Sequence, residues 1–180
     1  QRNVAGALHT LAMVLDAKGD ADAARECYRE SVAINRAQTQ EGREELNLVP
    51  SLMNLTCSLL RGGELEEAET LNREALDIAV RYLPVGHPTR STLVGNLASV
   101  LLGAKKNDDA VQLGREALGE AEAALETGHA ARVVLGDTLT RVLMAVGQYH
   151  EAETLNREAL EARRKELAAD HPAVRNALWN

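Results

Sequence analysis

The sequence predicts an all-α fold in which four helix-turn-helix repeats, and the start of a fifth, stack into a right-handed superhelix. The ten residues 67–76 reappear without a change at 151–160, an offset of 84 residues. Halving that offset to 42 lands on residues 109–118, which keep the alanines, the leucines and the Arg-Glu pair. Apolar residues recur at helical spacing within each unit, and units that cannot bury their apolar face alone must stack on their neighbours.

The composition agrees with packing of helix on helix. A chain of 180 residues can bury a core as a single domain without disulfides or a metal. Its hydrophobic fraction is 45%, yet it contains one Trp, three Tyr and no Phe, so Leu, Ala and Val must fill the interior. We therefore expect one cooperative unit.

The 42-residue period sets the expected boundaries of the repeats. The first repeat fits if its closing loop, from Gln38 to Val49, is two residues longer than the others, which a loop tolerates at low cost. After Pro172 the chain begins a fifth unit, and this start, with the beginning at Gln1, suggests a piece of a longer protein. The expected repeats are 4–47, 48–89, 90–131 and 132–173, with a partial fifth at 174–180.

Two short helices make up each repeat. In the third repeat the apolar stripes are Leu93, Leu97, Val100 and Leu101, then Ala110, Leu113, Ala117 and Leu118. Tight turns join the helices, and in them Gly or Asn is expected to adopt the left-handed conformation that ends a helix. The turns are Lys18-Gly19-Asp20, Gly62-Gly63-Glu64, Lys105-Lys106-Asn107 and Val146-Gly147-Gln148.

A histidine stands at the same place in the links between repeats. The links contain Gly86-His87-Pro88, Gly128-His129-Ala130 and Asp170-His171-Pro172. Proline is tolerated in the first turn of a helix because its missing N–H has no partner there. These histidines are therefore interpreted as part of a helix start, and their spacing of one repeat is too wide for a shared metal site.

These motifs together resemble the 42-residue tetratricopeptide repeats of kinesin light chains and nephrocystin-like proteins. The resemblance is carried by the Gly-x-Tyr-x-Glu-Ala-Glu string at 147–153, by Asn-Leu-Ala at 96–98 and by Arg-Glu-Ala-Leu at 73–76, and it covers nearly the whole chain. Light chains usually have Asn-Asn-Leu-Ala in the first helix. Here Met53 and Gly95 replace the first Asn, and Thr10 and Thr138 replace the second.

The resemblance implies that the first helix of each pair lines a concave groove that binds a protein or a peptide. The residues carried over to that groove are His9, Thr10, Met13 and Asp16; Met53, Asn54, Cys57 and Arg61; Thr92, Asn96, Ser99 and Leu102; Asp137, Thr138, Arg141 and Met144.

Several of these residues have a second interpretation. Asn54 and Asn96 can bond the backbone of an extended peptide, or they can bond a neighbouring helix. The three methionines can adapt to apolar ligand groups, although core packing is the role we favour for them. Arg61 and Arg141 can bind a carboxylate of the ligand or pair with acidic neighbours, and Cys57 is expected to pack as a small apolar residue.

The remaining features favour a protein-interaction scaffold and no enzyme, cofactor or metal. A net charge of −7 disfavours nucleic acid and anionic membranes as partners, and no apolar run approaches the roughly 20 residues of a membrane span. No phosphate-binding loop, Gly-x-Ser-x-Gly or His-Glu-x-x-His string occurs. Two cysteines at unmatched repeat positions favour a reducing cytoplasm.

Two alternatives stay open. The repeats can be a regulatory or sensor segment of a larger signalling protein of the ATPase type, in which the groove packs against the parent's own catalytic module. They can also form a self-associating structural array through the exposed ends of the solenoid, since the interrupted fifth helix leaves an apolar end at Trp179 and the first repeat has no obvious polar cap.

Overall fold

A computed structural model describes residues 2–39 and 43–170 of the chain. In these ranges it contains eight α-helices, one short 3-10 helix and no strand. The elements are α1 (Arg2–Lys18), α2 (Ala21–Gln38), η1 (Arg43–Asn47), α3 (Val49–Gly62), α4 (Leu65–Tyr82), α5 (Pro88–Gly103), α6 (Asn107–Ala124), α7 (Ala130–Ala145) and α8 (Tyr149–Asp170).

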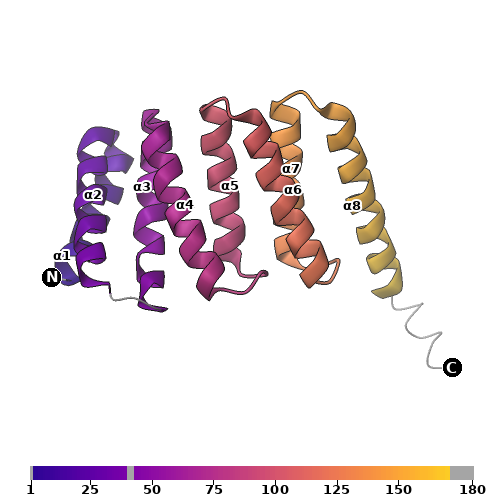
Figure 1. The fold of residues 1–180 in the computed structure, drawn as a ribbon, viewed down its shortest axis with the longest axis horizontal. Helices are drawn as coiled ribbons and strands as arrows, with labels where there is room; N and C mark the ends of the chain where they lie inside the picture. The colour runs from indigo at the N-terminus through magenta and orange to yellow at the C-terminus, as the bar shows by residue number, and fades with distance from the viewer. Residues whose placement is uncertain (1, 40–42, 171–180) are drawn as a thin grey trace.

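The helices form antiparallel pairs that stand side by side in a row, from α1 and α2 at one end to α8 at the other (Figure 1). The prediction of an all-α solenoid of helix-turn-helix repeats is confirmed. The expected start of a fifth repeat, at 174–180, lies outside the described residues.

Each helix pair turns on a residue with left-handed backbone. Gly19, Gly63 and Gly147 have φ angles of 87°, 79° and 83°. In the third pair the left-handed residue is Lys105, with φ 58°, and the expectation that Asn107 takes this role is wrong, because Asn107 is already the first residue of α6. Position in the repeat decides the conformation here, since Lys105 stands 42 residues after Gly63 and 42 before Gly147.

The histidines between repeats cap the helices that follow them. His87 precedes Pro88 and accepts the backbone N–H of Thr89 on Nδ1, at 3.2 Å. His129 accepts the N–H of Ala131 in the same way, at 3.1 Å. The predicted role in helix starts is therefore confirmed for both, whereas His171 lies outside the described residues. The longer first link contains η1.

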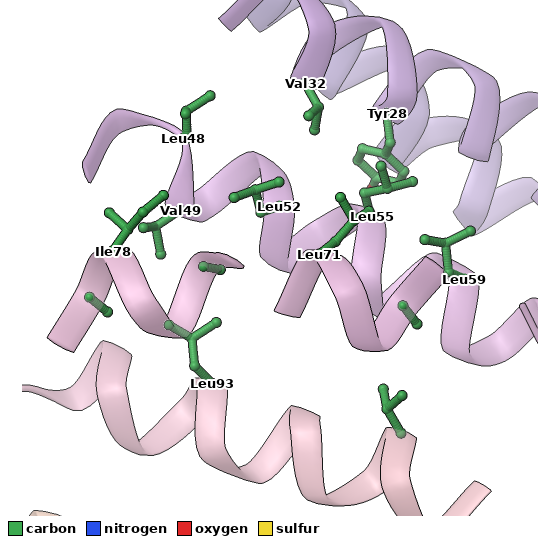
Figure 2. Packing of buried hydrophobic residues seen from close by; sticks show 14 of the residues in the cluster. Tyr28, Val32, Leu48, Val49, Leu52, Leu55, Leu59, Leu71, Ile78 and Leu93 are labelled. Atoms are coloured by element: carbon green, nitrogen blue, oxygen red, sulfur yellow. The ribbon is translucent and has the colours of Figure 1, made fainter. Parts of the chain in front are cut away.

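Small and branched aliphatic side chains fill the interior, as the composition predicts. Alanines stand at the tightest helix contacts, and Ala24, Ala68 and Ala110 are fully buried. Figure 2 shows the first of two core clusters, in which Leu52 and Leu55 lie among side chains of the neighbouring helices. Leu76 packs against both clusters, so that the core continues along the row.

The row is joined differently on its two sides. Consecutive first helices come close to one another, since α3 contacts α5 and α5 contacts α7. The second helices are joined by long charged side chains: Arg29 to Glu67 at 2.6 Å, Glu69 to Lys106 at 2.8 Å and Arg115 to Glu151 at 2.7 Å. The first helices therefore form one side of the row, and the second helices form the other. None of the helices in the described ranges has the length and apolar character needed to cross a bilayer.

Candidate binding face

The sixteen residues expected to line the groove lie on α1, α3, α5 and α7, four on each helix. We call the surface that they form the inner face. All of them except Thr138 keep some exposed surface. Thr138 is only 5% exposed, so it cannot contribute more than its edge to a ligand contact.

The hydroxyl groups of the inner face donate to the carbonyls of their own helices. Thr10 donates to Gly6 O at 3.0 Å, and Thr92, Ser99 and Thr138 donate to the carbonyl four residues earlier at 3.1, 2.9 and 2.8 Å. This pattern is common for Ser and Thr within helices. With their protons used in this way, these groups can only accept hydrogen bonds from a ligand.

The two asparagines connect neighbouring first helices. Nδ2 of Asn54 lies 3.3 Å from Nε2 of His9 on α1, and Nδ2 of Asn96 donates to Sγ of Cys57 on α3 at 3.7 Å. The interpretation that these amides bond a neighbouring helix is therefore correct for their nitrogen atoms. Neither Oδ1 has a partner among the described residues, so each asparagine keeps an acceptor for a ligand.

The charge of Arg61 on α3 is neutralised by a carboxylate of α1. Its Nη2 lies 2.5 Å from Oδ2 of Asp16. Asp16 also bonds the hydroxyl of Tyr28, and burial together with this carboxylate raises the pKa of Tyr28. The ring of His9 stands edge-on to Tyr28, with 5.7 Å between the ring centres. These four side chains form a polar cluster in which every charge is matched.

Cys57 is a half-buried free thiol on this face. Burial raises its pKa, and the nearby Arg61 only partly opposes that effect. A thiol with a raised pKa holds little thiolate and is a poor nucleophile. The expectation that Cys57 packs as a small apolar group fits this environment, apart from the hydrogen bond that it accepts from Asn96.

Arg141 and Asp137 are the charged groups of the inner face that have no ion pair with any described residue. Arg141 is exposed on α7, four residues after Asp137. It lies against Gly95 of α5, where an added Cβ would come within 3.8 Å of Nη2 of Arg141 and 3.7 Å of Oγ1 of Thr138. A side chain at position 95 would therefore stand in ordinary van der Waals contact with the guanidinium of Arg141 and the hydroxyl of Thr138.

The methionines differ from one another. Met13 and Met144 are both 55% exposed, and Met53 packs against the core. The favoured expectation of core packing is wrong for Met13 and Met144, because helical spacing places them on the side of the helix that no neighbour covers. Flexible thioethers in such positions are suited to apolar ligand groups of varied shape.

Two cavities lie at equivalent junctions between repeats. One, of about 160 Å³, lies among α4, α5 and α6, and the other, of about 250 Å³, among α6, α7 and α8. Their linings are related by the 42-residue period, as in Leu76 and Leu118 or Arg90 and Arg132.

The larger of these two cavities differs from the smaller one at three equivalent positions of the repeat. Glu122, Thr127 and Gly136 line it where valines line the smaller one. Arg90 is held in the smaller cavity by both oxygens of Glu120 at 2.8 Å. The replacement of the three valines can be recognised from the sequence when the repeats are aligned position by position. Acidic groups outnumber the single arginine in the larger cavity, so it does not offer a site for an anion.

Among the described residues, no group of three or more His, Cys, Asp or Glu side chains is arranged to hold a metal ion. The carboxyl groups with a lowered pKa, Glu67, Glu69 and Glu151, form ion pairs with basic residues of neighbouring repeats. Hydrogen bonds from Arg29 lower the pKa of Glu67, and those from Arg115 lower the pKa of Glu151. These shifts have structural causes and mark no catalytic site.

Comparison with known proteins agrees with this architecture. Two family models, both described as tetratricopeptide repeat, match residues 3–80 and 137–173. No curated protein matches the chain.

Several solved structures are similar in fold. A putative kinesin light chain with TPR-like repeats from Podosopora anserina is 24% identical, with a TM-score of 0.81 over 91% of this chain and 76% of that one. BtubC (BKLC) from P. vanneervenii is 22% identical, with a TM-score of 0.71 over 96% and 68%. A Rap protein complexed with Competence and Sporulation Factor is 16% identical, with a TM-score of 0.61 over 84% and 40%.

Proposed function

Because the chain belongs to the tetratricopeptide repeat proteins, we propose that it is a scaffold whose inner face binds a segment of another protein. The fold supports protein interaction as its general role, and one structure of the same fold is complexed with Competence and Sporulation Factor. The observation that carries the proposal is Arg141, an exposed cation that has no ion pair with any described residue and that lies beside the bare backbone of Gly95.

The chemistry of the face indicates which segment it accepts. Arg141 offers a planar fork of donors that suits a carboxylate. Met144 lies one helical turn further along α7 and can contact an apolar side chain. The free Oδ1 atoms of Asn54 and Asn96 can accept backbone N–H groups of an extended chain. The partner segment that fits this face therefore contains an acidic residue close to an apolar residue.

Arg61 has a different role from Arg141. Its guanidinium is already paired with Asp16, so a ligand carboxylate would have to displace a carboxylate that the chain itself supplies. We assign Arg61 to the connection between α1 and α3. The two arginines therefore provide an internal comparison, because they have the same chemistry on the same face and only one of them is available.

A selection from a displayed library of random peptides tests the proposal. Selected peptides are expected to contain Asp or Glu beside an apolar residue, and Arg141→Glu is expected to weaken their binding about tenfold or more, because a hydrogen bond to a charged group contributes about 1.5–3 kcal/mol. Arg157→Glu is the matched control, since Arg157 is 75% exposed on the second helix α8. Fluorescence anisotropy with the labelled peptide gives the affinities.

Two results would count against the proposal. Peptides whose affinity is unchanged by Arg141→Glu would remove Arg141 from the site. If Arg157→Glu weakens the affinity of the peptides and a bulky side chain at Gly95 leaves it unchanged, the peptides bind to the second helices instead. Gly95→Val serves for the second test, because the added side chain would contact Arg141 and Thr138.

A further inference from the structure

The smaller of the two cavities lies in the middle of the row, among α4, α5 and α6 (Figure 1). Its lining comes from these three helices, from the link between α4 and α5, and from Leu135 of α7. The volume of this cavity is about 160 Å³. An engineered apolar cavity of roughly 150 Å³ in another protein binds benzene, so there is room here for one small molecule.

Three valines give this cavity an apolar wall. Val94 of α5 is 6% exposed, and Val85 lies in the link before that helix. Val80 of α4 lines the cavity and is nevertheless 48% exposed, so it stands where the cavity meets solvent. The residues at the equivalent positions of the later repeats, Glu122 and Arg164, are charged and exposed. Covering Val80 removes apolar surface from water, which favours an apolar ligand.

One buried hydroxyl interrupts the apolar wall. Ser91 of α5 lines the cavity and is 3% exposed, and its Oγ has no hydrogen-bond partner among the described residues. Valines stand at the equivalent positions of the neighbouring repeats, Val49 and Val133. A buried polar group without a hydrogen bond costs free energy, and a ligand that supplies the bond removes that cost. The cavity therefore suits a ligand that has a hydroxyl or carbonyl group.

The charged groups around the cavity disfavour an ionic ligand. Arg90 is 8% exposed, and its guanidinium is already bonded to both oxygens of Glu120 at 2.8 Å and to the carbonyl of Leu83 at 3.4 Å. Glu116 also lines the cavity and is exposed. An anion would meet this carboxylate, and a cation would have to leave water for an apolar wall. A neutral ligand avoids both costs.

We propose that this cavity binds one small neutral molecule that has an apolar body and a single hydrogen-bonding group. The hydroxyl of Ser91 bonds that group, and the apolar body covers Val80. None of the sixteen residues of the inner face lines this cavity, so the site is separate from peptide binding there. Phenol represents the ligand class, and toluene is its matched partner because it has the same size and shape without the hydroxyl.

Titration of the 180-residue chain with phenol tests the proposal, with the methyl signals of Leu and Val followed in proton–carbon NMR spectra. The signals of Val80, Val94 and Leu135 are expected to shift and to saturate together. The signal of Val134, which is 46% exposed on α7 outside the cavity, is expected to stay in place. Toluene should shift the same signals, and benzoate should bind about tenfold more weakly than phenol or worse, because its charge is poorly accommodated.

Two variants test the roles of the lining residues. Ser91→Ala removes the hydroxyl without adding bulk, so it is expected to weaken phenol binding about threefold or more and to leave the affinity for toluene unchanged. Val80→Glu introduces the charge that Glu122 has in the next repeat, and it should weaken the binding of both ligands about fivefold or more. Val134→Glu is the matched control, since Val134 and Val80 are similarly exposed, and it should leave both affinities unchanged.

The methyl spectra also show whether each variant keeps the fold. The proposal would be overturned if phenol at millimolar concentration gave no saturable shifts, or if the shifts occurred at residues away from the cavity. Equal losses of phenol and toluene affinity in Ser91→Ala would remove the hydroxyl from the site. Benzoate that binds as tightly as phenol would contradict the preference for a neutral ligand.

Discussion

The turn of the third helix pair provides a sharp test of how position in a repeat governs backbone conformation. Lys105 has left-handed backbone where the other three repeats have glycine. The turn is otherwise the same: the N–H of Lys105 bonds Leu102 O at 3.0 Å and the next N–H bonds Leu101 O at 2.9 Å. At Gly63 the corresponding distances, to the carbonyls of Leu60 and Leu59, are 3.2 and 3.0 Å.

The structure gives the expected gain from Lys105→Gly. A side chain in the left-handed region costs about 1–2 kcal/mol per residue, while glycine loses about 0.5–1 kcal/mol more conformational entropy on folding. The side chain of Lys105 has no partner among the described residues, so the substitution removes no contact. The difference leaves about 0.5–1 kcal/mol of stabilisation, or a rise in Tm of about 1–4 °C for a chain of this size.

Thermal unfolding followed by circular dichroism measures the effect. The reciprocal variant Gly63→Lys is expected to lower Tm by a similar amount, because an added Cβ there meets no atom within 4 Å and only the backbone conformation changes in cost. An unchanged or lower Tm for Lys105→Gly, together with a lower Tm for Gly63→Lys, would refute the reasoning. It would mean that the third turn is not strained in the way that its φ angle indicates.

Other features of the fold give further expectations, each measured as the midpoint of urea unfolding. Ala68→Leu should destabilise by about 1–3 kcal/mol, since Ala68 is fully buried between helices; no loss would mean that the helices can separate freely. His87→Ala should cost about 1 kcal/mol, because the N–H of Thr89 loses its cap, and an unchanged midpoint would deny the cap an energetic role. The hydrogen bonds of Arg29 hold the pKa of Glu67 below its ordinary value of 4.5, so this pair stabilises the fold fully above that pH and loses its contribution as the pH falls through the lowered pKa. Glu67→Gln should therefore reduce the acid-induced loss of stability, and an equal loss in both proteins would contradict this account.

The architecture could be predicted because every signal for it is local. The repeat of residues 67–76 at 151–160 establishes the period, and the stripe of Leu93, Leu97 and Leu101 follows from helical spacing alone. The capping histidines were found from their neighbours in sequence. Turn chemistry favours Asn and Gly and therefore does not predict the left-handed Lys105. The alignment of the repeats does, because it places Lys105 at the position of Gly63 and Gly147.

The inner face could be predicted only as a set of positions. Which of its groups are available depends on pairs such as Asp16 and Arg61, which stand 45 residues apart and come together only when the repeats stack. No spacing rule distinguishes Arg61 from Arg141, although one is paired and the other is free. The exposure of Met13 and Met144 has the same origin, because a helical stripe shows that residues share a side and leaves open whether a neighbour covers it.

The two identical segments show why position along the row determines what a residue can do. Within α4, Asn72 is fully buried, and Leu76 packs against both core clusters. In α8 the same residues, Asn156 and Leu160, are exposed. Since the sequences are identical, the difference arises from the neighbours alone. A solenoid therefore gives identical residues different surroundings along the row, while a change of residue on the inner face, as at Gly95 and Arg141, alters the surface itself.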